Sequence, residues 1–157
     1  SLGSNYSNSD VEQILKKYKL KYKKFENEDE LIDEVALLLS KNKIIGWFQG
    51  RMEFGPRALG ARSILANPKP AYMKDKVNEI KRREQFRPFA GSVLQERVHE
   101  LFEVPEKNHF SPFMVFCFQA KKEKRKDLAA IVNEDNTCRI QTVTPENGRY
   151  YKLIKKF

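Results

Sequence analysis

The densest group of residues able to bind an anion lies between positions 50 and 63. Glycine lets backbone N–H groups approach phosphate oxygens, and arginine presents a planar fork of donors that matches phosphate or carboxylate. The spacing therefore predicts an anion-binding loop, and the absence of a following Gly-Lys-Ser/Thr excludes a Walker loop. The alternative is a structural turn in which Arg57 or Arg62 pairs with Glu53. The polar members of the segment are Arg51, Glu53, Arg57, Arg62 and Ser63, and its glycines are at 50, 55 and 60.

A second basic segment, residues 81–90, interleaves cations with aromatic side chains. Pro88 drives the backbone of Arg87 toward an extended conformation. We expect Phe86 and Phe89 to be buried and to hold Arg87 in one geometry, which suits phosphate recognition. The alternative is a solvated helix end, whose cations favour the negative pole of the helix. The cations of interest are Lys81, Arg83 and Arg87.

Residues 137–143 alternate as a strand does, with Cys138, Ile140 and Thr142 on one face. The other face carries Arg139 and Gln141. Together these side chains indicate either a ligand-binding face or an exposed polar face, and the pattern favours neither.

The chain has 157 residues, 40% of them hydrophobic, and carries a net charge of +9 that favours an anionic partner. Two isolated cysteines and two isolated histidines predict neither a disulfide scaffold nor a metal site. The lysine-rich runs at 16–24 and 121–126 are typical of solvated surface, so nucleic acid is not the expected partner. No apolar run reaches the length of a membrane span and no signal peptide is present, so we expect a cytoplasmic protein without membrane contact.

These residues must be positioned by a mixture of helices and strands. Ser9 followed by Glu12 predicts an N-cap for the first helix. The mixture predicts one α+β domain over residues 1–157, with a helical lead-in at 1–42 and the sheet-containing core at 43–157. Hydrophobic periodicity predicts helices at 10–19, 27–42, 71–82, 95–102 and from 149, and strands at 44–48, 63–66, 89–94, 113–119 and 137–144, with a short strand possible at 20–26.

Five segments, in order along the chain, closely resemble the C-terminal domain of the O-carbamoyltransferases of the nodulation and antibiotic-tailoring type. They are residues 46–60, 62–66, 86–90, 111–114 and 139–143. The resemblance implies a YrdC-like fold, that of the threonylcarbamoyladenosine-biosynthesis domain, with a twisted mixed sheet flanked by helices. The Asn-Thr-Ser-Phe-Asn motif that closes such domains does not occur here. The resemblance therefore implies that the YrdC-like core is incomplete at its C-terminal end.

The resemblance also implies a reaction. In such enzymes this domain forms carbamoyl adenylate from carbamoyl phosphate and ATP, with release of pyrophosphate. A separate N-terminal domain of kinase-like fold, which holds a metal, passes the carbamoyl group to a substrate hydroxyl. The expected co-substrate is ATP with Mg, and no metal site is expected within this chain.

Functional residues follow from the same resemblance, position by position. Carbamoyl phosphate and the nucleotide phosphates are assigned to the catalytic residues Arg51, Lys81, Arg87 and Arg139. Substrate-binding support is assigned to Arg57, Arg62, Ser63, Arg83 and Gln141. Three departures bear on the substrate contacts: Ala61 replaces an expected Asn, Gly91 an expected Pro, and Asn133 an expected His.

Two other functions fit the same residues. A non-catalytic nucleotide- or RNA-binding module requires the lysine-rich runs to align along one extended face. A docking scaffold for the missing domain requires an exposed apolar patch at Trp47 or along 113–119. The catalytic hypothesis instead requires Arg51, Lys81, Arg87 and Arg139 to converge on one concave pocket.

Overall fold

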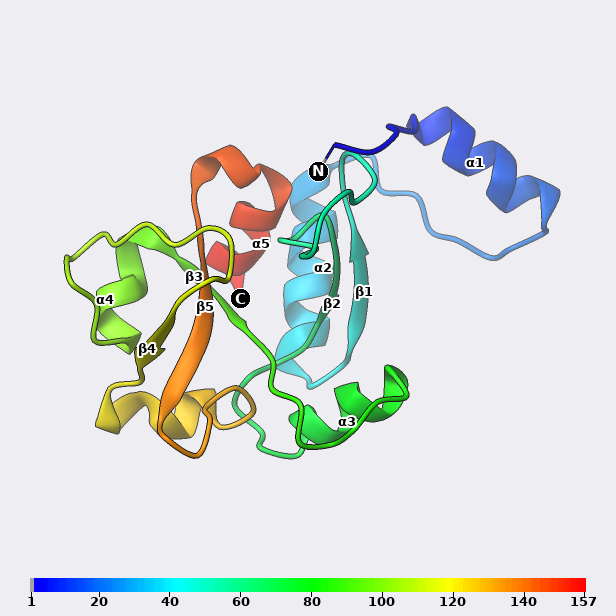
Figure 1. Ribbon diagram of the computed structural model, residues 1–157. Helices are drawn as coiled ribbons and strands as arrows, with labels where there is room; N and C mark the ends of the chain where they lie inside the picture. Colours follow the sequence, from blue (N-terminus) through cyan, green and yellow to red (C-terminus); the bar gives the residue numbers. More distant parts are fainter. Residues whose placement is uncertain (1) are drawn as a thin grey trace.

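The computed structural model describes residues 2–157 and confirms the α+β class (Figure 1). The strands are β1 (Ile45–Phe48), β2 (Arg62–Leu65), β3 (Gly91–Leu94), β4 (Cys117–Gln119) and β5 (Thr137–Val143). The α-helices are α1 (Asn8–Lys17), α2 (Glu28–Ser40), α3 (Met73–Ile80), α4 (Val98–Leu101) and α5 (Arg149–Lys156). Short 3-10 helices are η1 (Gln95–Arg97), η2 (Lys122–Leu128) and η3 (Pro145–Asn147).

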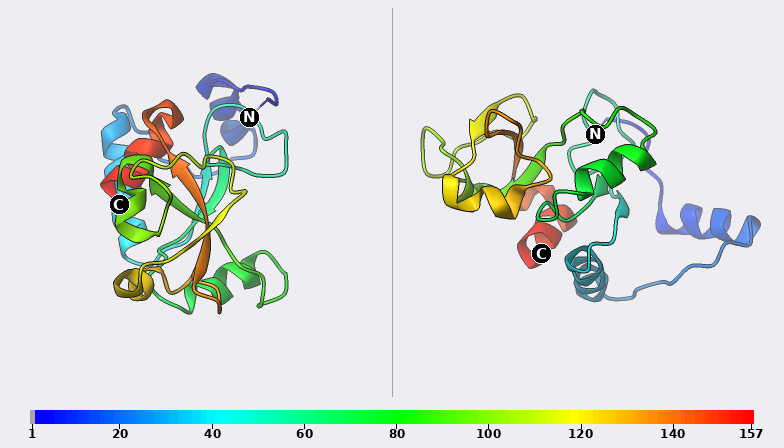
Figure 2. Two further views of the ribbon diagram at one scale, coloured as in Figure 1. Left: turned by 60° about the vertical axis from the view of Figure 1, so that its left-hand side comes forward. Right: turned by 90° about the horizontal axis from the view of Figure 1, so that it is seen from below.

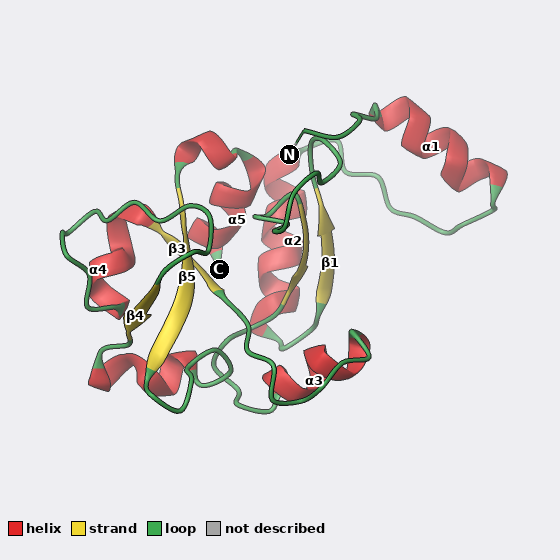
Figure 3. Ribbon diagram, in the orientation of Figure 1, coloured by secondary structure: helices red, strands yellow, loops and turns green. Residues whose placement is uncertain are grey.

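The strands form two separate small sheets instead of one continuous sheet (Figure 3). Strands β1 and β2 are antiparallel, with Trp47 opposite Ser63. In the second sheet β5 lies between β3, to which it is parallel, and β4, to which it is antiparallel. The mixed sheet that the resemblance implied is therefore present in three strands, and it is not closed.

The main core joins both sheets to two helices. Helices α2 and α5 lie together on one side of the strands (Figure 2). Trp47 of β1, Val143 of β5 and Leu153 of α5 pack in one cluster with the buried face of α2. Trp47 is only 7% exposed, so it does not provide the docking patch that one hypothesis required.

The opposite side of β5 packs into a second cluster. Cys138 and Ile140 are fully buried there with Val98 and Phe102, as the alternation of this strand predicted. Burial raises the pKa of the Cys138 thiol to about 12, so this side chain stays protonated and serves in packing.

Three local predictions were wrong. Helix α1 begins after Ser7, which exchanges hydrogen bonds with Asp10, so Ser9 is not its N-cap. Residues 20–26 form no strand, because the chain turns at Lys19, which has a positive φ, and runs back to the start of α2 as a loop that lies apart from both sheets (Figure 1). The predicted strand at 113–119 shrinks to β4, because Met114 has a positive φ that interrupts an extended backbone.

No helix among the described residues is long and apolar enough to cross a lipid bilayer. Residues 2–157 also contain no cluster of three or more metal-ligating side chains.

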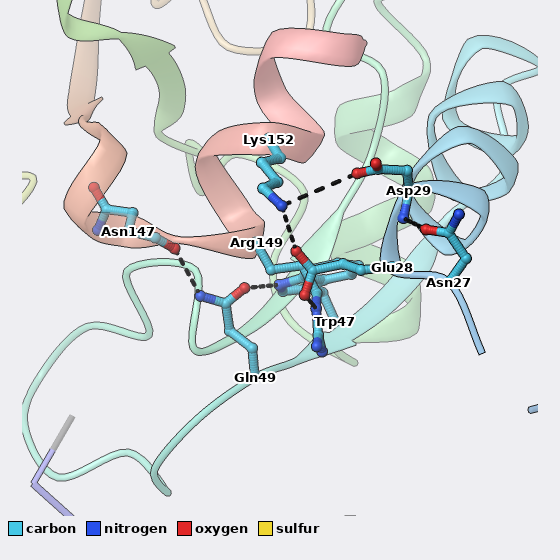
Figure 4. Close-up of polar contacts among 8 residues, drawn as sticks. All are labelled: Asn27, Glu28, Asp29, Trp47, Gln49, Asn147, Arg149 and Lys152. Carbon is cyan, nitrogen blue, oxygen red and sulfur yellow. Dashed lines mark hydrogen bonds and ion pairs between the residues drawn. The ribbon is translucent and has the colours of Figure 1, made fainter. Parts of the chain in front are cut away.

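Ion pairs of Glu28 link the start of α2 to the start of α5 (Figure 4). Its carboxylate accepts from Arg149 Nε and from Lys152 Nζ, each at 2.9 Å. The hydrogen bonds from Lys152 and Arg149 lower the pKa of Glu28 below its ordinary value of 4.5. Two cations in the first turn of α5 oppose the positive pole of that helix, and Glu28 offsets them.

A neighbouring polar contact fixes the end of β1 to η3. Gln49 accepts from Trp47 Nε1 at 3.2 Å and donates to the Asn147 carbonyl at 3.0 Å, as Figure 4 shows. The indole nitrogen of a buried tryptophan is thereby satisfied, and the chain leaves β1 toward the arginine-rich loop in a defined direction.

We predict that Glu28→Gln lowers the free energy of unfolding by about 0.5 to 1 kcal/mol near neutral pH, since the pair is partly exposed and screened by solvent. Because the folded-state pKa is depressed, this stabilisation is present above the unfolded pKa and is lost as pH falls through the folded pKa. Urea unfolding of both proteins at about pH 7 and about pH 3 measures the difference.

The matched control is Glu79→Gln, because Glu79 is exposed on α3 and forms no ion pair within residues 2–157. Its substitution should leave the stability within about 0.5 kcal/mol at both pH values. An effect of Glu28→Gln that persists unchanged at low pH would contradict the electrostatic account.

Candidate functional site

Asn78 organises the basic segment that follows α3. It is fully buried, and its side-chain amide donates to the Gln85 and Arg87 carbonyls at 3.1 Å. Its Oδ1 accepts from Arg83 Nε at 2.6 Å. One amide therefore closes the turn and orients an arginine. Sequence reasoning missed Asn78, although a polar residue directly after Val77, on the buried side of α3, was an available signal.

The turn and β5 place three of the predicted arginines within range of one another's charge. The Arg83 guanidinium lies 4.4 Å from the centre of the Phe89 ring and donates to the Pro88 carbonyl at 3.4 Å. Burial lowers the pKa of Arg83, and so do the nearby positive charges of Arg87 and Arg139. Arg139 lies on β5, so the fold gathers cations that are about fifty residues apart in sequence. We call Arg83, Arg87 and Arg139 the arginine cluster.

The arginine cluster has little negative charge to balance it. Arg83 uses neutral acceptors, and Arg87 has a 3.5 Å pair with Glu84 in which both side chains are exposed. Within residues 2–157, the buried Nε of Arg139 has no hydrogen-bond partner. A buried donor without a partner is costly and like charges repel, so these three arginines form a candidate anion site.

The arginine-rich loop is tied to the same strand. Gln141 of β5 is 1% exposed, and its side chain donates to the Leu59 carbonyl at 3.2 Å. Its Oε1 accepts from Ser92 Oγ at 3.2 Å, and that hydroxyl accepts from Tyr150 at 2.7 Å. The alternative of an exposed polar face is therefore wrong for Gln141, which positions the loop.

Gly60 seats this loop against α5. Its φ is +85°, and a Cβ at this position would overlap the ring of Tyr150. The Gly60 N–H donates to Ser63 Oγ at 3.1 Å. At the other end of the loop, the Met52 backbone pairs with Gly3 and Ser4 of the N-terminal arm. The loop is thus held at both ends, while its arginines remain accessible.

The remaining predicted residues lie around these two segments. Arg51, Arg57 and Lys81 are exposed, and Arg57 donates only to the adjacent Pro56 carbonyl. Arg62 is half-buried with its guanidinium 6.0 Å from the centre of the Phe48 ring, and its buried Nε has no partner among the described residues.

The contacts test the structural alternatives more directly. Glu53 forms no ion pair within residues 2–157, so the turn held by Glu53 with Arg57 or Arg62 is not observed. Phe86 is 78% exposed, which makes its predicted burial wrong. Hydrogen bonds to Asn78, and not aromatic packing on both sides, hold Arg87 in place. Among the described residues, no hydrogen bond or ion pair links Arg51 or Lys81 to the arginine cluster, so their part in one site stays a prediction.

A cavity of about 500 Å³ lies elsewhere, between β2 and β3. Of the predicted site residues, only Ser63 lines it. The arginine cluster does not line this cavity, and we identify the candidate anion site from its unbalanced charge and from the Arg139 Nε donor that has no partner within residues 2–157.

The three departures from the family pattern have structural roles. Ala61 donates to the Ala58 carbonyl and accepts from Gln49, and so helps to close the loop. A Cβ at Gly91 would lie 2.6 Å from Ile131 Cδ1, so the glycine permits close packing there. Asn133 donates to Thr137 Oγ1 at 3.2 Å in the turn before β5.

The sequence comparisons define the family. Residues 36–157 match the model of the carbamoyltransferase C-terminus, and the chain belongs to this family. It is 47% identical to the nodulation protein NolNO of Sinorhizobium fredii over 82% of this chain and 19% of that protein. Identity to the nodulation protein NolO of Bradyrhizobium diazoefficiens is 44% over 84% of this chain and 24% of that protein.

An uncharacterized protein of Methanocaldococcus jannaschii is 45% identical over 99% of this chain and 26% of its own length. The chain thus spans about a fifth to a third of the length of these curated relatives. The resemblance read from the arginine-bearing segments is confirmed at the level of the family.

We predict that Gly60→Ala destabilises the fold by roughly 2 to 4 kcal/mol, because the substitution combines a strained φ with a clash against a buried ring. Gly50→Ala is the control, since Gly50 also has a positive φ but open space around its Cβ position. It should cost about 1 kcal/mol. Thermal and urea unfolding measure both; equal losses would show that the contact with Tyr150 is unimportant.

We predict that Asn78→Ala costs roughly 1 to 3 kcal/mol and weakens phosphate binding, because the Gln85 and Arg87 carbonyls and Arg83 Nε lose their shared partner together. Asn133→Ala removes a single hydrogen bond and should cost about 1 kcal/mol with binding unchanged. Urea unfolding and calorimetric titration with inorganic phosphate separate the two effects. Unchanged binding in folded Asn78→Ala would contradict the positioning role.

Proposed function

We propose that this chain is the part of an O-carbamoyltransferase that forms carbamoyl adenylate from carbamoyl phosphate and ATP. The observation that carries the proposal is the arginine cluster, with three cations gathered from two distant segments and a buried Arg139 Nε without a partner. Membership of the carbamoyltransferase family supports the choice of carbamoyl phosphate among the possible anions.

The atoms and leaving groups of the proposed reaction determine which anions the site has to bind. Cleavage of carbamoyl phosphate by water yields carbamate and inorganic phosphate. A carbamate oxygen then attacks the α-phosphorus of ATP, the bond to the β-phosphate oxygen breaks, and pyrophosphate leaves. Each turnover therefore releases one phosphate and one pyrophosphate. Several anions must be neutralised and aligned in this step, which is work that preorganised arginines perform.

Residue roles follow from position. Arg83, Arg87 and Arg139 bind the phosphate of carbamoyl phosphate, because the charges of Arg87 on the ordered turn and of Arg139 on β5 both act on Arg83. Arg51 and Lys81 bind the nucleotide phosphates, with ATP carried as its magnesium complex. Arg57, Arg62 and Ser63 support the loop side of the site, and Gln141 positions that loop from β5.

Transfer to the final acceptor belongs to another part of the enzyme. We propose that a separate N-terminal domain of kinase-like fold passes the carbamoyl group to a substrate hydroxyl. The curated relatives are several times longer than the stretch that they share with this chain, which is consistent with such a division.

An RNA-binding module receives no support from the shape of the molecule. The two lysine-rich runs lie on α1 with the chain after it and on η2, at opposite ends of the molecule (Figure 1). They do not form one extended basic face, which a single-strand binding groove would need. The docking hypothesis retains one observation, the exposed side chains of Phe113, Val115 and Phe116, and docking is compatible with catalysis.

We predict that the chain binds carbamoyl phosphate and that Arg139→Ala weakens this binding by at least tenfold, because the buried Nε donor and the charge of Arg139 are lost together. Arg139→Lys keeps the charge without the planar fork and should recover only part of the affinity. Isothermal titration with carbamoyl phosphate, and separately with a non-hydrolysable ATP analogue, measures both.

The control is Arg97→Ala, because Arg97 is paired with Glu100 and lies outside the arginine cluster. It should bind as the unsubstituted chain does. Equal weakening in both variants would point to general charge attraction, and unchanged binding in folded Arg139→Ala would overturn the proposed site. Phosphate and pyrophosphate release, measured in the same preparations, tests the reaction itself.

A further inference from the structure

The N-terminal arm is bonded to the arginine-rich loop at one residue, Met52. The Gly3 N–H donates to the Met52 carbonyl at 2.9 Å, and the Met52 N–H donates to the Ser4 carbonyl at 2.8 Å. The arm passes beside the loop that follows β1 (Figure 1). We call Gly3 and Ser4 the strap. The strap joins two segments that are remote from each other in sequence.

Glycine permits the close approach at the strap. A Cβ added at Gly3 would lie 2.5 Å from the Met52 carbonyl oxygen and 2.8 Å from Met52 Cβ. The oxygen belongs to the backbone and cannot rotate away, so a larger residue at position 3 would push the two segments apart. Ser4 contributes only its carbonyl, because its side chain is exposed and forms no hydrogen bond within residues 2–157.

Residues 50–57, the first part of the loop, depend on the strap for their order. Within the part of the chain that the structure describes, the two bonds of the strap are the only hydrogen bonds between this stretch and another segment. The stretch also contains Gly50 and Gly55, both with a positive φ and with open space at the Cβ position. Glycines give a backbone little conformational restraint of its own. The strap is therefore the main polar constraint on this part of the loop.

Two hydrogen bonds to Met52 fix the directions of its neighbours. The Met52 N–H lies in the same planar peptide unit as the Arg51 Cα, and the Met52 carbonyl lies in the same unit as the Glu53 Cα. Holding both groups therefore fixes the point at which the Arg51 side chain leaves the backbone. That side chain is exposed and forms no hydrogen bond or ion pair within residues 2–157, so its guanidinium is open to a ligand.

We propose that the strap is a positioning element of the nucleotide site, which holds Met52 so that Arg51 meets the phosphates of ATP. An arginine on an unordered loop loses conformational freedom when it binds a ligand, and this loss weakens the complex. A loop that the strap has already ordered avoids most of that cost. The inference rests on the proposed function, because it takes over the assignment of Arg51 to the nucleotide phosphates.

The strap lies before the part of the chain that matches the carbamoyltransferase C-terminus, which starts at residue 36. The archaeal relative nevertheless matches 99% of this chain, so positions 3 and 4 fall within the shared stretch. Under the proposal, a segment that precedes the matched domain completes one of its ligand sites. Substitutions in the strap should then change nucleotide affinity and leave the fold intact, because neither the strap nor Met52 belongs to a core cluster.

The test compares Gly3→Ala, which breaks the strap, with Ser4→Ala, which keeps both of its hydrogen bonds. Isothermal titration with a non-hydrolysable ATP analogue and Mg²⁺ measures the affinity. We expect Gly3→Ala to weaken it about three- to tenfold and Ser4→Ala to change it about twofold or less. Carbamoyl phosphate, which the arginine cluster binds, should bind equally well to Gly3→Ala and to the unsubstituted chain. Equal weakening for both ligands, or no weakening in Gly3→Ala, would overturn the proposal.

A double-mutant cycle decides whether the strap acts through Arg51. If it does, Arg51→Ala weakens binding of the ATP analogue, and adding Gly3→Ala to Arg51→Ala weakens it further by about twofold or less. Losses that multiply in full would show that the strap acts on another group, and the positioning role would be wrong. Circular dichroism of every variant checks that the fold is unchanged.

A measurement without ligand separates this inference from the proposed function. Nitrogen-15 relaxation should show greater motion of the Arg51 and Met52 amides in Gly3→Ala than in Ser4→Ala, and the Met52 amide should exchange faster with water. If the ATP analogue binds but Gly3→Ala changes neither its affinity nor the motion of the loop, the inference alone is wrong. If the folded chain binds neither ligand, the proposed function is wrong and the inference falls with it.

Discussion

The buried amide of Gln141 is the constraint on which the arrangement of this domain depends. An amide that is nearly inaccessible to water must find partners inside the protein, and it finds them in the Leu59 carbonyl and the Ser92 hydroxyl. These contacts bind a long surface loop and an edge strand to β5. Tyr150 extends the chain of hydrogen bonds to α5, where the same ring excludes a side chain at position 60. The loop that carries arginines is therefore placed by the core.

The arginine cluster differs from Gln141 because its positive charges are not balanced within the protein. Its cations are held by neutral groups: the Asn78 amide, the Pro88 carbonyl and the face of Phe89. Such partners fix geometry without cancelling charge, so repulsion among the cations remains, and the buried Arg139 Nε has no hydrogen-bond partner within residues 2–157. Under the proposed function, a bound anion satisfies that donor and reduces the repulsion.

The sequence predicted the parts of this structure that depend on local pattern. Alternation along 137–143 gave the strand and its buried Cys138 face, and periodicity gave α2, α3 and α5 close to their observed bounds. It failed where one backbone angle decides the outcome, as at Met114, whose positive φ ends an apolar run that would otherwise extend β4. The sequence pattern also could not predict that the strands form two sheets, because strand pairing depends on contacts between residues remote in sequence.

The candidate site shows the same division. The pattern of residues 81–90 predicted a role for Arg87, and the resemblance added Arg83 and Arg139, but the predicted cause of order in this segment was wrong, since Phe86 is exposed. The actual reason is Asn78, and a single buried polar residue inside an amphipathic helix leaves little mark on a periodic pattern. The sequence pattern also could not predict the role of Gln141, because its hydrogen-bond partner, the Leu59 carbonyl, lies in a loop about eighty residues earlier.

We propose above all that Arg139 Nε donates a hydrogen bond to an anion bound by the arginine cluster. The most direct measurement is NMR of the arginine side-chain Nε–H signals during titration with carbamoyl phosphate, with each signal assigned by substitution. The account predicts that the Arg139 signal shifts most, together with those of Arg83 and Arg87, and that its exchange with water slows on binding. Saturable binding that leaves the Arg139 signal unmoved while other arginine signals shift would contradict it.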